Sequence, residues 1–187
     1  MPVRTARRIV REGIISLTVS VIIHLTQGSI LDRGIELFIT LPVLLALMPP
    51  LGGMAGAIGS MFCARLSTAL HLGTVRPRIE YNEVLTKNVL GVMTIAVVSS
   101  TYLSLAMYLL SDFAGIRTLN LFELAEITMV ASLSVLCTTL TAALLISFFS
   151  FRRNMDPSST TIPLVTATGD LATALSLVLA ARILGIT

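Results

Sequence analysis

The chain has 187 residues, of which 55% are apolar and only 12% are charged, with a formal net charge of +3. Its mean hydropathy of +0.91 excludes an ordinary water-soluble domain, which needs a polar surface. The basic residues lie between long apolar segments rather than on one continuous face, so they indicate membrane topology and not nucleic-acid binding. We therefore predict an all-α integral membrane protein that lies in a lipid bilayer and has no nucleic-acid partner.

Apolar segments along the chain predict a five-helix transmembrane bundle, which we expect to form a single domain over residues 1–187. A helix needs about 20 apolar residues to cross ~30 Å of hydrocarbon. The expected spans cover residues 14–31, 35–72, 88–110, 124–151 and 160–184.

The second segment is longer than one membrane crossing requires, because about 38 residues would form a straight helix of about 57 Å. Residues that interrupt helices occur within it at Pro42, Pro49, Pro50, Gly52 and Gly53. One kinked crossing and two short crossings both explain this pattern. A single crossing keeps most basic loop residues on the side of the N-terminus, in agreement with the positive-inside rule. We therefore expect one kinked crossing, with the N-terminus cytoplasmic and the C-terminus outside the cell membrane.

The glycines of this segment are candidates for lining a pore. Irregular backbone at membrane depth is tolerated where it faces protein or a water-filled cavity, which favours Gly52, Gly53 and Gly56 as pore-lining residues. The alternative is close helix packing, because Gly52, Gly56 and Ser60 follow the spacing of small residues at helix interfaces. The sequence leaves both interpretations open.

Two acidic residues, Glu123 and Glu126, lie near the expected outer end of the fourth span together with Asp112. Such a cluster forms a candidate outer vestibule that would concentrate cations. The alternative is that both glutamates favour the N-terminus of a helix.

A carboxylate, Asp170, lies near the centre of the last apolar segment. A charge at that depth costs about 2.5 to 3.5 kcal/mol on insertion scales, so such groups normally face a bundle interior or a water-filled path. Thr166 lies one helical turn earlier, and Gly169 and Thr173 add small or hydroxyl-bearing surface that is also a candidate pore lining. The alternative is a buried carboxylate that binds a neighbouring helix.

The candidate ligands are oxygen atoms, which indicates a hard cation. Mg²⁺ keeps several waters and needs few carboxylates, so we predict it as the transported ion, with no organic cofactor. The candidate metal-contacting residues are Asp170, Asp156 and Thr166. Asp156 precedes Pro157 at the start of the last span, where an ion entrance and a helix N-cap are both compatible with it.

These motifs resemble those of a known family. The string from Pro163 to Asp170, after Asp156-Pro157 and a proline-broken span that ends in Gly52-Gly53-x-Ala55-Gly56, is similar to the membrane domain of MgtE-type magnesium transporters and channels. The string from Ala64 to Ala69, together with Gly169-Asp170, is closer to the related animal and archaeal solute-carrier branch. The resemblance implies a five-helix fold, a pore between two such units, and Mg²⁺ bound by Asp170, with Asp156 opening the last helix near the pore.

The resemblance also has departures. The glycine-rich segment of the family usually contains an asparagine followed by a glutamine or a glutamate. Here Met54, Ala57, Ile58 and Gly59 occupy the candidate positions. The cytosolic sensor domains of the bacterial proteins are also not expected, so the chain resembles a single half-unit. A paralogous half that supplies the polar groups, or a homodimer of altered selectivity, would each account for the difference.

We therefore expect a divalent cation transporter that works as a homodimer or as a heterodimer with a paralogous half, and not an enzyme. An enzyme would need several acidic, histidine or serine groups that converge at one depth, and Asp170 has no evident catalytic partner. The alternative function is a non-conducting membrane subunit that assembles with a paralogous transporter half.

Overall fold

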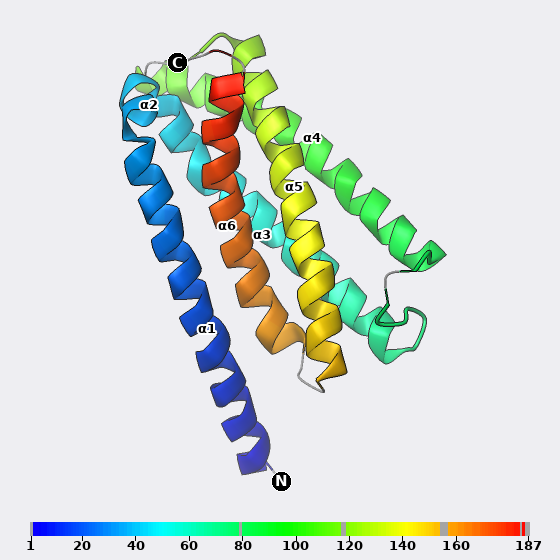
Figure 1. Ribbon diagram of the computed structural model, residues 1–187. Helices are drawn as coiled ribbons and strands as arrows, with labels where there is room; N and C mark the ends of the chain where they lie inside the picture. Colours follow the sequence, from blue (N-terminus) through cyan, green and yellow to red (C-terminus); the bar gives the residue numbers. More distant parts are fainter. Residues whose placement is uncertain (1, 79, 117–118, 154–156, 184, 186–187) are drawn as a thin grey trace.

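The computed structural model describes residues 2–78, 80–116, 119–153, 157–183 and 185, and the described residues contain helices and no strands. The helices are α1 (Pro2–Arg33), α2 (Ile35–Thr40), α3 (Pro42–His71), α4 (Glu83–Ala114), α5 (Leu121–Arg152) and α6 (Pro157–Ile183) (Figure 1). Within the described residues, α1, α3, α4, α5 and α6 are long and apolar enough to cross a membrane. The prediction of an all-α membrane protein with five spans is confirmed.

The interruption expected in the second segment lies at Leu41, where the backbone leaves the helical region with φ −126° and ψ 79°. Pro42 then occupies the first turn of α3, a position where its missing N–H costs no helical hydrogen bond. The helix continues without a break through Pro49, Pro50, Gly52 and Gly53. Short α2 therefore forms a corner, and α3 alone provides the crossing.

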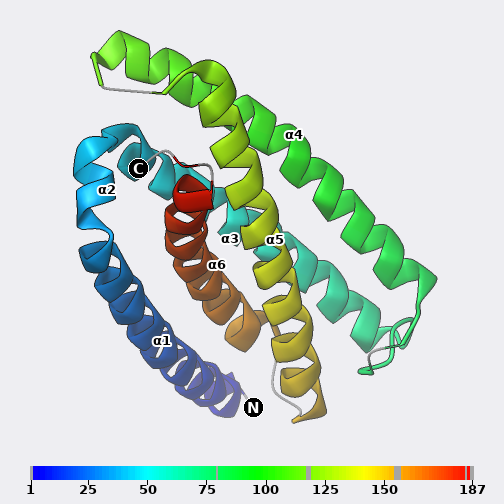
Figure 2. The same cartoon turned by 45° about the horizontal axis from the view of Figure 1, so that its top comes forward.

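The long helices are arranged around α6. Helices α1, α3 and α5 all pack on α6, and α4 packs on α3 and α5 (Figure 2). The two ends of the chain lie at opposite ends of the bundle (Figure 1). Side chains of α6 can therefore reach three neighbouring helices, α1, α3 and α5.

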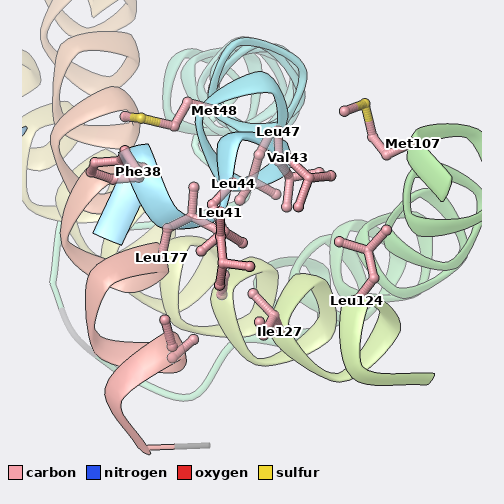
Figure 3. Close-up of a cluster of buried hydrophobic side chains, with 14 of the residues drawn as sticks. Phe38, Leu41, Val43, Leu44, Leu47, Met48, Met107, Leu124, Ile127 and Leu177 are labelled. Carbon is pink, nitrogen blue, oxygen red and sulfur yellow. The ribbon is translucent and has the colours of Figure 1, made fainter. Parts of the chain in front are cut away.

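Two apolar clusters hold the bundle together, one toward each end of α3. The first joins α2, α3, α5 and α6 through residues such as Phe38, Leu44 and Leu177 (Figure 3). The second begins at Ile58 and continues through Phe62 against α4 and α5. Between them, residues 52–57 contain three glycines or alanines on the face toward α6, so the two backbones approach closely there.

Helices α1 and α4 expose large apolar side chains on the outside of the bundle, for example Leu25, Val98 and Tyr102. Such surfaces are costly in water and are expected where a protein faces lipid. The chain is accordingly a multi-pass membrane protein.

Candidate cation site

Gly52 on α3 faces the carboxylate of Asp170 on α6. A Cβ atom at Gly52 would lie 2.6 Å from Oδ1 of Asp170 and 3.9 Å from Oγ1 of Thr173. No real side chain tolerates a contact of 2.6 Å, so a glycine at this position makes room for the carboxylate. The position of Asp170 therefore depends on the residue that faces it on α3.

The same contact continues one turn away. A Cβ at Gly56 would lie 3.1 Å from Cγ2 and 3.6 Å from Oγ1 of Thr166. On α6, a Cβ at Gly169 would lie 3.4 Å from Cβ of Ala55 and 3.4 Å from Oγ1 of Thr139. Small residues on both helices thus let the polar face of α6 lie against α3, which is the packing interpretation of these glycines.

The carboxylate of Asp170 is half-buried on α6, on the side that faces α3. Gly52 contacts it from α3, and His24 on α1 is close enough to interact with it electrostatically. Within the described part of the chain, the carboxylate makes neither an ion pair nor a hydrogen bond. The carboxylate therefore does not form an interhelical salt bridge with any described residue, which was the alternative interpretation of a carboxylate at this depth.

Hydroxyl groups accompany the carboxylate on α6. Thr173 is 1% exposed, and its Oγ1 donates a hydrogen bond to the carbonyl of Gly169 at 2.8 Å. Thr166 is half-buried, and its hydroxyl has no hydrogen-bond partner among the described residues. Asp170 and Thr166 therefore present oxygen atoms with free lone pairs on one face, one helical turn apart.

The structure brings most of the predicted site residues together and separates others from them. Gly52, Gly56, Gly169, Thr166 and Thr173 lie around Asp170 at the contact of α3 with α6. Gly53 is exposed on another face of α3, and a Cβ there would meet no atom within 4 Å. Asp156 lies outside the described residues.

The two predicted vestibule residues are at the N-terminal end of α5. The carboxylate of Glu123 accepts a hydrogen bond from the backbone N–H of Asn120 at 3.2 Å and completes a capping box. Glu126 is exposed one turn further on. Glu123 thus has the helix-terminal contact that formed the alternative interpretation of this pair.

Sequence reasoning does not connect His24 to Asp170, because it cannot place α1 on α6. The sequence does carry one indication of this packing, because polar residues recur at every fourth position of α1, at Ser16, Ser20 and His24. Ser16 and Ser20 are buried, and Oγ of Ser20 lies 3.2 Å from the carbonyl oxygen of Pro163 on α6. This polar stripe identifies the face of α1 that packs on α6.

The site has few metal ligands. In the part of the chain that the structure describes, no three histidine, cysteine, aspartate or glutamate side chains come together as a metal cluster. One carboxylate and one free hydroxyl cannot replace the full coordination shell of a divalent cation. The arrangement can instead receive an ion that keeps most of its water.

Comparison with known families gives one match. The family model of the divalent cation transporter MgtE matches residues 48–180, a region that includes both Gly52 and Asp170. Comparisons with curated proteins and with solved structures gave no match. MgtE is a family of transporters and not of enzymes. Because the match covers more than half of the sequence, the chain belongs to the MgtE family of divalent cation transporters.

Proposed function

We propose that this chain transports Mg²⁺ through a pore formed by two such units, and that Asp170 contacts the hydrated ion. Transport of divalent cations is the general function of the family. The observation that carries the more specific proposal is the half-buried Asp170 carboxylate, which has no ion pair or hydrogen bond within the described residues. An unpaired charge at membrane depth is costly unless it serves a ligand or a water-filled path.

Mg²⁺ suits this arrangement because it loses its water slowly and often binds through one or two carboxylates and several waters. Asp170 would accept hydrogen bonds from the hydration waters and supply a negative charge. Thr166 would contact the same shell through its free hydroxyl, one turn along α6. Because Gly52 has no side chain, the carboxylate can occupy the position that it has in the structure.

A second unit would complete the site. One chain offers a single carboxylate at the contact of α3 with α6, and a dimer would place two such groups around a shared path. The partner is a second copy or a paralogous half. The glycines that face α6 hold Asp170 in place, whereas exposed Gly53 is free to line the path or to approach the partner.

The proposed orientation puts the N-terminus in the cytoplasm and the C-terminus outside the cell membrane. It rests on the basic residues of the N-terminal segment and of the loops after α3 and α5. In this orientation Asp156 marks the cytoplasmic entrance. Glu123 and Glu126 then lie at the outer end, where negative charge would attract cations.

The test is Mg²⁺ uptake into proteoliposomes that contain the purified full chain and a trapped fluorescent Mg²⁺ indicator. We expect uptake by the wild-type protein and a loss of about tenfold or more in Asp170→Asn, since interactions with charged groups are worth about 1.5 to 3 kcal/mol. Asp32→Asn is the matched control, because Asp32 is an exposed aspartate at the end of α1. Its uptake should equal that of the wild type.

Two results would overturn the proposal. Uptake by Asp170→Asn at the wild-type rate would remove the carboxylate from the conduction path. Wild-type protein that assembles in the liposomes but carries no Mg²⁺ would instead favour a non-conducting subunit that needs a paralogous half.

A further inference from the structure

A second polar feature lies at the corner where α1, α2 and α6 meet. A partly open cavity of about 600 Å³ is lined there by charged residues from all three helices. Its α6 residues begin at Val178, eight residues after Asp170, which corresponds to about 12 Å along the helix. The cavity is thus separate from the proposed cation site, and no residue of that site lines it.

The corner is held in place by Gly34. A Cβ atom at this position would lie 3.3 Å from Cγ2 of Val178 and 3.4 Å from Cε2 of Phe38, which is tighter than an ordinary contact. The turn between α1 and α2 therefore seats directly on α6. This seating places Arg33, the last residue of α1, on the same cavity as Arg182 from the last turn of α6.

The cavity has a mixed charge. Arg33 and Arg182 provide two guanidinium groups, and Glu36 of α2 provides one carboxylate. Among the described residues, these three side chains form no ion pair with one another or with a neighbour. An arginine pair is suited to a phosphate, which guanidinium groups bind through paired hydrogen bonds. The carboxylate is suited to a cation that belongs to the same ligand.

The surroundings of the cavity are apolar. Ile39 on α2 is 72% exposed and Ile183 at the end of α6 is 75% exposed. Both helices that carry the arginines end here as membrane spans. The cavity therefore opens where the hydrocarbon core meets the headgroup layer, at the depth of lipid phosphates.

We propose that this cavity binds the headgroup of a phospholipid that carries a primary ammonium, of the phosphatidylethanolamine class. The lipid phosphate binds Arg33 and Arg182, its ammonium binds Glu36, and its acyl chains lie along the apolar residues of α2 and α6. A purely anionic headgroup would leave Glu36 facing negative charge. A choline headgroup has no N–H group to donate to the carboxylate.

The experiment is native mass spectrometry of the purified full chain, released from micelles that contain equal amounts of phosphatidylethanolamine, phosphatidylcholine and phosphatidylglycerol with identical acyl chains. We expect the ethanolamine lipid to be retained preferentially. The double variant Arg33→Gln/Arg182→Gln should retain about tenfold less of it. Glu36→Gln should keep lipid bound but lose the preference for ethanolamine over choline.

Controls separate this proposal from non-specific binding and from the cation site. Arg65→Gln removes an exposed arginine of α3 that does not line this cavity and should keep the preference. Asp170→Asn should keep it as well, so failure of the transport proposal would leave this one standing.

Three results would overturn the proposal. They are equal retention of the three lipids by the wild type, a preference for phosphatidylglycerol, and an unchanged ethanolamine preference in the double arginine variant. Displacement of the lipid by millimolar inorganic phosphate would instead identify a site for the free anion and would also overturn it.

Discussion

Two glycines on one face of α3, Gly52 and Gly59, face different surroundings on α6. A Cβ at Gly59 would lie 2.7 Å from Cγ1 of Val165 and 2.8 Å from Cγ2 of Thr139, both of which are buried. A Cβ at Gly52 would lie 2.6 Å from the half-buried carboxylate of Asp170. Close approach of the helices is common to both positions, but Gly59 meets apolar atoms of Val165 on α6 and Thr139 on α5, whereas Gly52 meets a carboxylate on α6.

A glycine at a helix contact thus indicates that the two helices lie close together, but it does not indicate whether the contact serves packing or ion binding. At Gly59 the contact is with methyl groups of two buried side chains, so it contributes to packing. At Gly52 the space is occupied by a carboxylate that makes no ion pair or hydrogen bond within the described residues. A change at Gly59 should therefore alter stability, and a change near Gly52 should alter ion binding.

The largest expected effect is the rise in melting temperature that Mg²⁺ causes. This rise should depend on Asp170 and not on the packing contact at Gly59. A ligand that binds only the folded protein stabilises it by about 2.7 kcal/mol at a hundred times its dissociation constant. We expect Mg²⁺ to raise the melting temperature of the wild type and to have no such effect on Asp170→Asn. Gly59→Ala should still respond to Mg²⁺ from a lower starting temperature. A thermal shift series over Mg²⁺ concentration checks this, and a full response by Asp170→Asn would contradict it.

The next effect concerns packing at Gly59. Its change to alanine inserts a methyl group where two buried side chains leave no space, and overpacking of this kind typically costs about 1 to 3 kcal/mol. We expect a lower midpoint in a denaturation series in detergent, with Mg²⁺ uptake per folded molecule close to that of the wild type. Unchanged stability together with lost uptake would assign Gly59 to the conduction path instead.

A smaller effect is expected at Gly52. The methyl group of Gly52→Ala would displace the end of the Asp170 side chain, which can rotate away, so stability should change little. Mg²⁺ uptake should fall by roughly three- to tenfold, equivalent to about 0.7 to 1.4 kcal/mol. Gly91→Ala on α4 is the matched control, because Gly91 is exposed and a Cβ there meets no atom within 4 Å. Equal uptake by the two variants would show that the position of the carboxylate is unimportant.

The sequence was sufficient to predict the five spans because each is an apolar run of membrane length with polar or glycine punctuation. Gly34 and Gly115 lie where α1 and α4 end, and Pro42 lies where the second segment is interrupted. Pro49 and Pro50 were weaker guides, because α3 continues through them. Packing against the rest of the bundle overrides the local preference of these residues.

The arrangement of the site could be predicted only in part. The polar stripe of α6 from Thr166 to Thr173 follows from helical periodicity, and the structure places it against α3. Periodicity alone does not say which glycine of the Gly52-Gly53 pair meets that stripe, because the answer depends on how α3 is rotated about its axis. The approach of His24 from α1 likewise depends on tertiary packing that a single sequence does not encode locally.

The smallest expected effect tests whether a hydroxyl beside Asp170 contributes through its polarity or only through its shape. Thr166→Val keeps the branched shape against Gly56 and removes an oxygen that has no partner among the described residues. Loss of one hydrogen bond to a hydration water is worth about 0.5 to 1 kcal/mol, so Mg²⁺ uptake should fall by roughly two- to fivefold. Thr128→Val on α5 is the control, because the Thr128 hydroxyl already donates to the carbonyl of Leu124 at 2.7 Å. If both variants transport at the wild-type rate, Thr166 does not contribute to ion contact. The carboxylate of Asp170 is then the only group of the Gly52 contact that binds the hydrated ion.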